Sequence, residues 1–462
     1  MPWLCGFETE SGIIKVAKAR IAYVCTECGA HSVKWAGQCG ECMAWNTLTE
    51  TKVTVVQPAA PAGAVGLSSL DSLPDDFERR YATGFGEFDR VLGGGLVPGA
   101  VILLGGDPGV GKSTLLQQVS AKLQDELQVC YASGEESLRQ IGQRASRLML
   151  SGDNLKLLAD TSLENVIAQA SACKANVLII DSIQTMTSSR LPSAPGSVAQ
   201  LRECVGSVVQ FAKQSETAVF VIGHVTKEGA IAGPRVVEHM VDTVLYFEND
   251  PTSRYTMIRS VKNRFGASSE MGVFAMTESG FLEVRNPSAI FLSRESVDEP
   301  GSVVAVVWEG SRPLLVEIQA LVADGASNYP KRLAQGVDQN RLALLLAVLQ
   351  RHGGLSIISE DVFVNVVGGM RVSETSVDLP TLLAIVSSFK DKPCRKGLLA
   401  FGEVGLAGEV RPVKFGTERI TAAAQQGFKL AIVPHGNVPK KAIAGIEVVG
   451  VRRLSEVLDY AF

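Results

Sequence analysis

The chain has 462 residues, of which 46% are hydrophobic and 20% are charged, and its formal net charge is −4. Such a composition is typical of globular proteins, and the length predicts two or three domains. The slight negative charge argues against a wholly basic protein that coats nucleic acid, although it leaves room for a local basic channel. No apolar run is long enough to span a bilayer and the first twenty residues lack a signal-peptide core, so we expect a cytoplasmic protein without a membrane partner.

Four cysteines near the N-terminus form two C-x-x-C pairs. They are Cys25, Cys28, Cys39 and Cys42. Thiolates on two tight turns can converge on one tetrahedral Zn²⁺, whereas a redox C-x-x-C would need a thioredoxin-like βαβ unit around it. We therefore predict a four-cysteine zinc ribbon within residues 1–50, in which Trp35 and Trp45 cover the turns or stack on bases. His31 lies between the pairs, and we interpret it as a polar loop residue.

A linker and a glycine-rich segment follow this ribbon. Residues 51–79 are rich in Ala, Pro, Val, Ser and Asp, a composition that predicts a linker. Ordered structure is expected again from residue 80. The run 83–95 ends in three consecutive glycines and leads through a short turn into an apolar stretch at 100–104, which is typical of a buried strand.

Residues 106–113 fit the pattern G-x-x-x-x-G-K-[ST] of a phosphate-binding loop. The loop precedes a helical pattern at 113–119, so its glycines can turn backbone N–H groups toward a phosphate at the positive end of a helix. Lys112 is then expected to reach the β- and γ-phosphates of ATP, and the Ser113 hydroxyl to ligate Mg²⁺. An ordinary glycine-rich turn is the alternative, but the complete pattern between a strand and a helix predicts a nucleotide site.

Two further apolar runs end in carboxylates. The run 129–133 leads to Glu135 and Glu136, and the run 177–180 ends at Asp181. The carboxyl ends of parallel strands face the ligand crevice of an α/β sheet. Asp181 is therefore predicted to hold Mg²⁺, and Glu135 to orient or deprotonate the attacking water, with Glu136 as the alternative. The predicted nucleotide-binding residues are Gly106, Asp107, Pro108, Gly109, Val110, Gly111, Lys112, Ser113, Thr114 and Asp181.

The end of this predicted domain carries a cationic turn. The apolar run 218–222 precedes His224, which either senses the γ-phosphate or caps the strand. Two paired strands are then expected, and they lead into the turn 262–266, whose cations are Lys262 and Arg264. Considered alone, these residues predict a solvated basic turn.

The last part of the chain, from residue 287 to residue 462, predicts a separate α+β domain. Apolar runs at 303–308 and 314–322 are typical of strands, and helical patterns and a further strand at 430–434 follow them. Neither a Ser/His/Asp set nor a cluster of metal ligands emerges from this part of the sequence.

Together, these motifs resemble the bacterial RadA/Sms family of recombination and repair ATPases over nearly the whole chain. The resemblance rests on the four cysteines, the phosphate loop, the last domain and the runs 83–95, 133–137 and 262–266, the last of which is specific to the family. It implies an α/β fold with a RecA-like ATPase core at 80–286 and a Lon-protease-like domain at 287–462. It also implies ATP-driven processing of single-stranded and branched DNA, including branch migration, by homohexameric rings that act with the RecA recombinase.

The same resemblance assigns roles to single residues. Glu135 falls on the position of the catalytic glutamate and Asp181 on that of the Walker B aspartate. In hexameric helicases resembling DnaB, a K-x-R pair at the position of Lys262 and Arg264 reaches the γ-phosphate bound by the neighbouring subunit. We therefore expect this pair to act in catalysis with Lys112 and Glu135. The rival interpretation is that the pair binds DNA phosphates.

The last domain departs from the Lon pattern at the residues of its chemistry. The protease serine is expected after an acidic-Gly-Pro-like stretch, but residues 374–376 lead into Val377, and Thr417 stands where a lysine is expected. Ser376 and Arg419 are the near substitutes, and an arginine cannot serve as a neutral base. We therefore expect a scaffold without peptidase activity that assembles subunits and contacts DNA. The alternative is an ATP-dependent protease-like or peptide-binding regulator, while the family resemblance disfavours a RecA-type strand exchanger.

Overall fold

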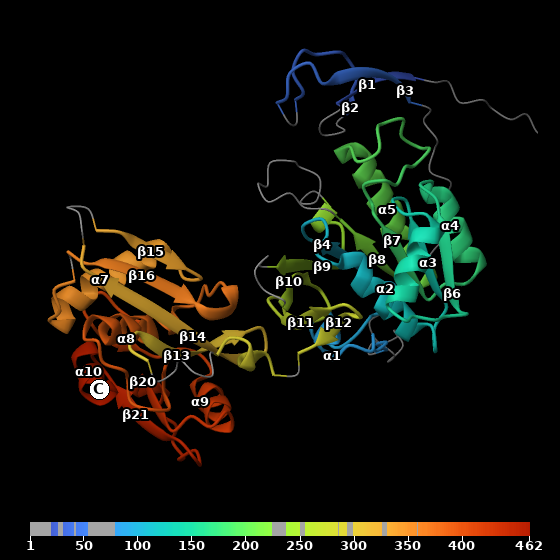
Figure 1. The fold of residues 1–462 in the computed structure, drawn as a ribbon. Coiled ribbons are helices and arrows are strands. Elements are labelled where there is room, and N and C mark those ends of the chain that lie inside the picture. Colours follow the sequence, from blue (N-terminus) through green and yellow to red (C-terminus); the bar gives the residue numbers. More distant parts are fainter. Residues whose placement is uncertain are drawn as a thin grey trace, which may run out of the picture.

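The computed structural model describes residues 20–25, 31–40, 43–53, 79–223, 237–249, 255–284, 286–292, 299–325, 330–357 and 359–462. These residues form a small N-terminal sheet and two larger units, which we call the central domain and the C-terminal domain (Figure 1). Three residues singled out in the sequence, Cys28, Cys42 and His224, lie outside the described residues.

The central domain is built on a nine-stranded sheet of order β12-β11-β10-β9-β4-β8-β7-β5-β6. The strands are β4 (Val101–Gly105), β5 (Val129–Ser133), β6 (Leu155–Ala159), β7 (Val177–Asp181), β8 (Ala218–Ile222), β9 (Thr243–Asn249), β10 (Tyr255–Asn263), β11 (Met271–Thr277) and β12 (Gly280–Glu283). Strands β4 to β9 are mutually parallel, and β10 to β12 are antiparallel. The parallel strands therefore place their carboxyl ends, with the phosphate loop and Asp181, on one edge of the sheet.

Helices cover both faces of this sheet. One face lies against α1 (Gly86–Leu92), α2 (Lys112–Leu123) and α3 (Leu138–Arg147), and the other against α4 (Leu163–Ala172) and α5 (Val198–Ser215). Every residue of β4, β5, β7 and β8 is consequently buried, which explains why these strands are continuous apolar runs in the sequence. The predicted α/β fold is confirmed.

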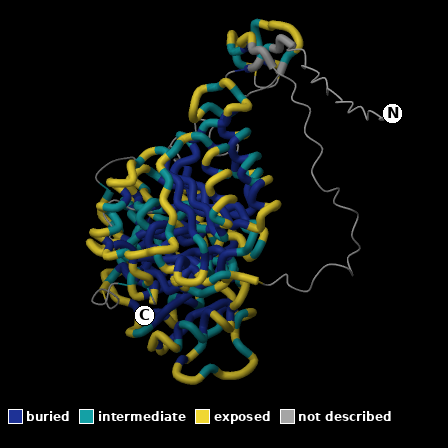
Figure 2. Tube along the Cα trace, turned by 90° about the vertical axis from the view of Figure 1, so that its right-hand side faces the viewer, coloured by how far each residue is buried: buried dark blue, intermediate teal, exposed yellow. Residues whose placement is uncertain are grey.

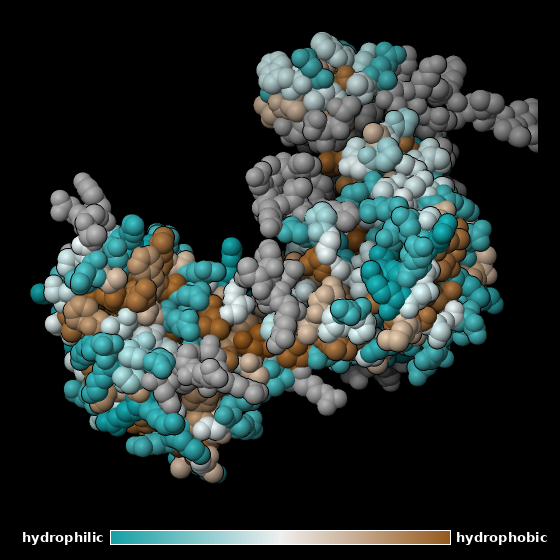
Figure 3. Space-filling model, viewed as in Figure 1, coloured by the Kyte–Doolittle hydropathy of each residue, from teal (hydrophilic) through white to brown (hydrophobic). Residues whose placement is uncertain are grey.

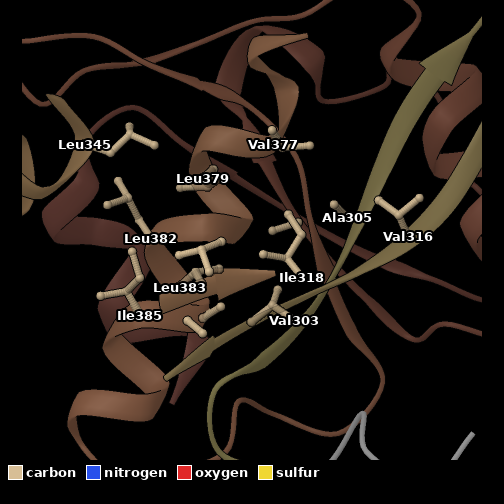
Figure 4. Packing of buried hydrophobic residues seen from close by; sticks show 14 of the residues in the cluster. Val303, Ala305, Val316, Ile318, Leu345, Val377, Leu379, Leu382, Leu383 and Ile385 are labelled. Carbon is tan, nitrogen blue, oxygen red and sulfur yellow. The ribbon is translucent and has the colours of Figure 1, made fainter. Parts of the chain in front are cut away.

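The C-terminal domain has a seven-stranded mixed sheet of order β15-β16-β14-β13-β17-β20-β21. Its strands are β13 (Ser302–Glu309), β14 (Arg312–Ala323), β15 (Arg332–Gln335), β16 (Asp361–Val366), β17 (Leu398–Ala400), β20 (Leu430–Pro434) and β21 (Glu447–Val451), beside a separate ribbon of β18 (Glu403–Val404) and β19 (Val410–Arg411). The helices are α7 (Gln339–Gly353), α8 (Asp378–Phe389), α9 (Gly416–Gln425) and α10 (Leu454–Ala461). The core of this domain forms where α8 lies across β13 and β14, as Figure 4 shows for Val303, Ile318 and Leu382.

The two larger domains share one apolar cluster. Met257, Met271 and Val273, from β10 and β11 of the central sheet, belong to the same cluster of buried residues as the core of the C-terminal domain. Figure 2 shows the buried residues gathered in the interior of the molecule, with intermediate and exposed residues around them. The C-terminal domain therefore packs on the antiparallel end of the central sheet.

The N-terminal sheet joins β1 (Arg20–Cys25) to β2 (His31–Ser32) and β3 (Leu48–Val53). Cys25 and Cys39 are buried in it beside Leu48. Trp35 and Trp45 are 59% and 70% exposed, so most of the surface of each residue faces solvent. Trp45 nevertheless lies along one side of Gly37, because a Cβ atom built there would stand 3.8 Å from its ring.

No helix among the described residues is long and apolar enough to cross a membrane. The surface does carry an apolar area over β15 and β16 (Figure 3). It includes Leu321 and Leu333, which are 59% and 54% exposed and both align with Phe363 on the strand between them. Exposed apolar surface of this kind is typical of contact with another protein.

Candidate functional site

The phosphate loop lies between the centre of the sheet and the start of a helix. β4 ends at Gly105, and α2 begins at Lys112. Gly106 has φ +149 and a Cβ atom there would lie 2.9 Å from Phe247, so the chain can leave the strand in this direction only with glycine. The loop thus presents its backbone N–H groups at the N-terminus of α2, where an anion is stabilised.

The Lys112 side chain lies inside this loop. Its ammonium donates to the backbone carbonyls of Gly106 and Asp107 at 2.7 and 2.9 Å, and only 4% of the residue is exposed. Burial lowers the pKa of Lys112, and the carboxylates of Asp181, Asp107 and Glu135 act in the opposite direction. Residues from the ends of three neighbouring elements therefore surround one buried cation, as expected for a site that binds phosphate.

Asp181 is held in place from the neighbouring strand. It ends β7, is 3% exposed, and accepts a hydrogen bond of 2.6 Å from the Tyr131 hydroxyl of β5. Burial, followed by the charge of Asp181, raises the pKa of the Tyr131 phenol well above its usual value, so this phenol remains a donor at neutral pH. No local pattern in the sequence points to Tyr131, because its contact depends on the register in which β5 pairs with β7.

Glu135 and Glu136 differ in their partners. Glu135 accepts a hydrogen bond from the Ser182 hydroxyl, directly after Asp181. Glu136 instead forms a two-point ion pair with Arg144 of α3, which also donates from Nε to Gln117 of α2 at 2.8 Å. The structure thus places Glu135 beside Asp181 and near Lys112, and Glu136 in a contact between helices.

Removing the Tyr131 hydroxyl should weaken the site without disturbing the core. In Tyr131→Phe the ring stays and the hydrogen bond to Asp181 is lost, which for a charged acceptor is worth about 1.5–3 kcal/mol. We expect ATP turnover to fall roughly 10- to 100-fold, a higher Mg²⁺ concentration for half-maximal rate, and unchanged nucleotide binding without Mg²⁺. Tyr246→Phe is the matched control, because Tyr246 donates to Glu238 at the same 2.6 Å. An unchanged Mg²⁺ dependence in Tyr131→Phe would contradict the role.

The turn 262–266 is a rigid structure at the end of β10. The Asn263 side chain accepts from the backbone N–H of Phe265 at 2.9 Å and donates to the carbonyl of Val91 at 3.3 Å. Gly93, with φ +88, is required opposite the turn, because a Cβ atom there would lie 2.9 Å from the Phe265 carbonyl oxygen. The glycine run and the turn 262–266 are therefore two halves of one contact.

The two cations of this turn have different surroundings. The Lys262 ammonium donates to three backbone carbonyls at 2.7–3.2 Å, those of Glu238, His239 and Val241. Burial, and then the charge of Arg264, lower the pKa of Lys262. The Arg264 side chain is 57% exposed, and its Nη1 lies 3.5 Å from Asp242 Oδ1, a pair that is weak in water. Lys262 therefore anchors the chain locally, whereas Arg264 is the cation presented to solvent.

The turn 262–266 lies at the sheet edge opposite the phosphate loop. Asn263 aligns with Thr243, which aligns in turn with Ile102, three positions before Gly105. At about 3.3 Å per residue, this is roughly 10 Å along the strands, and the turn is also two strands away from β4. The structure thus does not bring Lys262 and Arg264 together with the phosphate loop of the same chain.

The described part of the zinc ribbon contains one cysteine of each pair. Cys25 and Cys39 are 0% and 2% exposed and share a small cluster with Leu48. Cysteine thiols are donors that a structural Zn²⁺ prefers. The thiol of Cys25 also lies 3.2 Å from the Thr47 hydroxyl. The donor set fits zinc, and Cys28 and Cys42 would complete it.

We expect one Zn²⁺ per chain, lost when Cys25 and Cys28 are both changed to Ser, because two thiolates are too few to hold it. Elemental analysis of protein purified without chelators measures this directly. Cys173→Ser, a half-buried cysteine outside the ribbon, should retain the metal. Zinc that persists in the double variant would refute the assignment.

In the C-terminal domain, the near substitutes for a protease dyad are buried in an ion pair. Ser376 and Arg419 are each 1% exposed, and Arg419 donates to both carboxylate oxygens of Glu374 at 2.8 and 2.9 Å. The Ser376 hydroxyl also donates to Glu374. The Ser376 side chain is thus buried, and the carboxylate that accepts its hydrogen bond is paired with Arg419.

Three family models match separate parts of the chain. A model described as "AAA domain" matches residues 71–230, one described as "Rubredoxin metal binding domain" matches 23–50, and one described as "Subunit ChlI of Mg-chelatase" matches 339–437. With the sheet order, the phosphate loop and the carboxylates beside it, they define a RecA-like P-loop ATPase with an N-terminal zinc ribbon and a Lon-like C-terminal domain.

Similar proteins cover nearly the whole chain. "DNA repair protein RadA" of Pseudomonas aeruginosa is 54% identical over 456 residues, which are 97% of this chain and 100% of that protein. The proteins of the same description from Escherichia coli and Bacillus subtilis are 53% and 44% identical, each over 96% of this chain and 99% of that protein. The chain belongs to the RadA family of DNA repair proteins. Among solved structures, a KaiC-like protein of Pyrococcus horikoshii OT3 aligns with a TM-score of 0.38 and 19% identity, over 45% of this chain and 99% of that chain.

Proposed function

We propose that this protein is a DNA-stimulated ATPase motor of the cytoplasm that moves branch points in recombination intermediates during DNA repair. The observation that carries the proposal is the gathering of Lys112, Asp181 and Glu135 at one edge of the sheet, with Arg264 exposed at the opposite edge. A site divided in this way suits a ring in which each nucleotide lies between two subunits. We propose domain boundaries near residues 50, 80 and 287, and homohexamers as the assembly.

Within one subunit, we propose that ATP binds across the phosphate loop. Lys112 would exchange its two loop carbonyls for the β- and γ-phosphates, so the loop is held ready before nucleotide arrives. Ser113 and Asp181 would hold Mg²⁺, which when bound offsets phosphate charge. Asp181, fixed by Tyr131, then keeps its position while Glu135 orients the attacking water. The pairing of Glu136 with Arg144 favours Glu135 over Glu136 in this role.

Between subunits, we propose that Arg264 completes the neighbour's site. A guanidinium there would stabilise the charge that develops on the transferred phosphoryl group. The turn 262–266 is held by Asn263 and by the glycine run, so the exposed guanidinium starts from a fixed backbone. Lys262 would join it in the assembled ring by leaving the carbonyls that it contacts here. The exposed apolar side chains Leu321 and Leu333 are a further reason to expect assembly.

We propose single-stranded and branched DNA as the substrates and the RecA recombinase as the functional partner, as the family resemblance implies. The test uses a labelled four-way DNA junction, with ATP or a non-hydrolysable analogue. Wild type should separate the arms of the junction with ATP but not with the analogue. Lys112→Ala should bind the junction without moving its branch point. The proposal would be contradicted if the protein binds the junction and hydrolyses ATP but the branch point never moves.

The alternative is a peptide-binding regulator that uses the Lon-like domain. Burial of Ser376 against Glu374 disfavours cleavage of peptides, although it leaves peptide binding open. We expect no casein cleavage, with or without ATP. Cleavage that disappears in Ser376→Ala would overturn this expectation and restore the protease interpretation.

A further inference from the structure

The ion pair of Arg419 and Glu374 supports one particular strand. Strand β13 pairs with β14 along its whole length, but its other edge meets β17 only at Val304 and Ala305. Beyond that point, the carbonyl of Val306 accepts from Arg419 Nη1 at 2.6 Å, and the N–H of Trp308 donates to Glu374 Oε1 at 2.7 Å. These side chains therefore replace the missing strand partner where buried backbone groups need one.

The supported half of the hairpin points to the central domain. At its tip, Arg312 donates to both carboxylate oxygens of Glu87 in α1 at 2.8 and 2.7 Å. Glu309, opposite Arg312 in the hairpin, accepts from Arg259 of β10 at 2.7 Å. The four side chains are 10–20% exposed, so both ion pairs are largely removed from water. Arg312 also donates to the Met271 carbonyl of β11 at 3.1 Å, which adds a third attachment.

The backbone approach at the tip is equally close. Gly310 forms the turn with φ +59, and a Cβ atom there would lie 2.7 Å from the Cα atom of Glu270. Glu87, besides Arg312, accepts from the backbone N–H of Val273 at 2.9 Å. The tip is thus fitted to α1, β10 and β11 together.

These contacts join the C-terminal domain to the strand that carries the exposed cation. Arg259 lies on β10, which continues to Asn263 and the turn 262–266. On the other side of the contact, α1 leads into the glycine run that packs against the same turn. A shift of β10 on nucleotide binding must therefore move the hairpin or break the pair of Arg259 and Glu309. A shift of α1 must likewise move the hairpin or break the pair that Arg312 makes there.

We propose that the pair of Arg419 and Glu374, close in sequence to the expected dyad positions, braces the β13–β14 hairpin, and that its tip couples the C-terminal domain to the nucleotide state of the central domain. Removing one partner of a shielded ion pair takes from the remaining charge a close counter-ion, so single substitutions should disrupt the coupling strongly. The inference needs nucleotide binding by the central domain, and it is independent of any action on DNA.

Amide hydrogen exchange on the full chain, with and without a non-hydrolysable ATP analogue and Mg²⁺, tests the coupling. In wild type, the analogue should slow exchange several-fold both in 106–123 and in the hairpin 302–323. In Arg312→Ala, protection of 106–123 should persist, while the nucleotide effect on the hairpin should disappear. Arg411→Ala, which removes an exposed pairing partner of Glu409 elsewhere in the C-terminal domain, should behave as wild type.

Arg419→Lys tests the brace separately, because lysine keeps the charge and loses the two-point contact with Glu374. Its hairpin should also lose the nucleotide effect. If this buried substitution prevents folding, Arg312→Ala decides alone, since its side chain lies at the tip. The proposal is overturned if the analogue leaves the wild-type hairpin unaffected, or if Arg312→Ala retains the full nucleotide effect there. If the analogue does not slow exchange at 106–123 in wild type, the result would instead count against the nucleotide site.

Discussion

Lys112→Ala is expected to abolish ATP hydrolysis while the protein remains folded. The ammonium is the buried cation of the phosphate loop, and removing a preorganised charge from such a site costs at least about 10²-fold in rate. Burial already lowers the pKa of Lys112, so the folded state holds this charge at a cost. The midpoint of thermal unfolding should therefore change little. Turnover of ATP and the circular dichroism melting curve of the same sample measure both effects.

Lys122→Ala is the matched control for this variant. Lys122 lies on the same helix α2, and its ammonium donates to the Gly84 carbonyl on the surface, away from the phosphate loop. We expect near wild-type ATP turnover from it. Wild-type turnover by purified Lys112→Ala would show that the nucleotide site has been assigned wrongly.

Arg264→Ala is expected to reduce ATP turnover by roughly 10³- to 10⁵-fold, the range found for arginines that act between subunits. Its nucleotide binding should remain, because Arg264 lies at the sheet edge opposite the phosphate loop of its own chain. The fold should tolerate the change, since the side chain is 57% exposed and its pair with Asp242 is weak. Arg202→Ala, on the outer helix α5, controls for the loss of a surface arginine.

Mixing two inactive variants tests whether Arg264 acts between subunits. Rings that combine Arg264→Ala with Lys112→Ala subunits contain some interfaces with an intact Lys112 and an intact Arg264. ATP turnover should return in the mixture, and light scattering should show that both variants assemble. If the mixture stays inactive and Arg264→Ala alone has lost DNA binding with a flatter salt dependence, the turn 262–266 contacts DNA phosphates instead.

The centre of the central domain could be predicted from sequence because its strands are buried on both faces. β4, β5, β7 and β8 contain apolar residues throughout, and the phosphate loop supplies a complete pattern beside one of them. β6 was not predicted, because it is the edge strand and its residues are partly exposed. The same applies to β15, a four-residue edge strand of the C-terminal domain.

The contacts that hold the site in place were not predictable, since they join residues far apart in the chain. Tyr131 reaches Asp181 over 50 positions, and Arg312 reaches Glu87 over 225. Either pair depends on strand register or domain packing, neither of which leaves a local pattern in the sequence. For the same reason, the sequence alone does not distinguish Lys262 from Arg264. In the fold, backbone carbonyls from a distant segment hold the Lys262 ammonium.

The C-terminal domain illustrates the limit of reasoning from a missing motif. The sequence indicated that a protease dyad is absent and that Arg419 stands near its position. It did not indicate that Arg419 would be buried against Glu374 and the edge of β13, because both partners are identified only by the fold. A structural contact therefore lies next to the positions where the Lon pattern predicts the dyad.

The most direct test of the proposed function is ATP turnover measured with single-stranded DNA, with unfolded polypeptide and without either. We predict that DNA raises the turnover of wild type and that unfolded polypeptide does not. The stimulation should disappear in Lys112→Ala. If polypeptide raises turnover and DNA leaves it unchanged, the protein is a peptide-dependent regulator and the proposed DNA motor is contradicted.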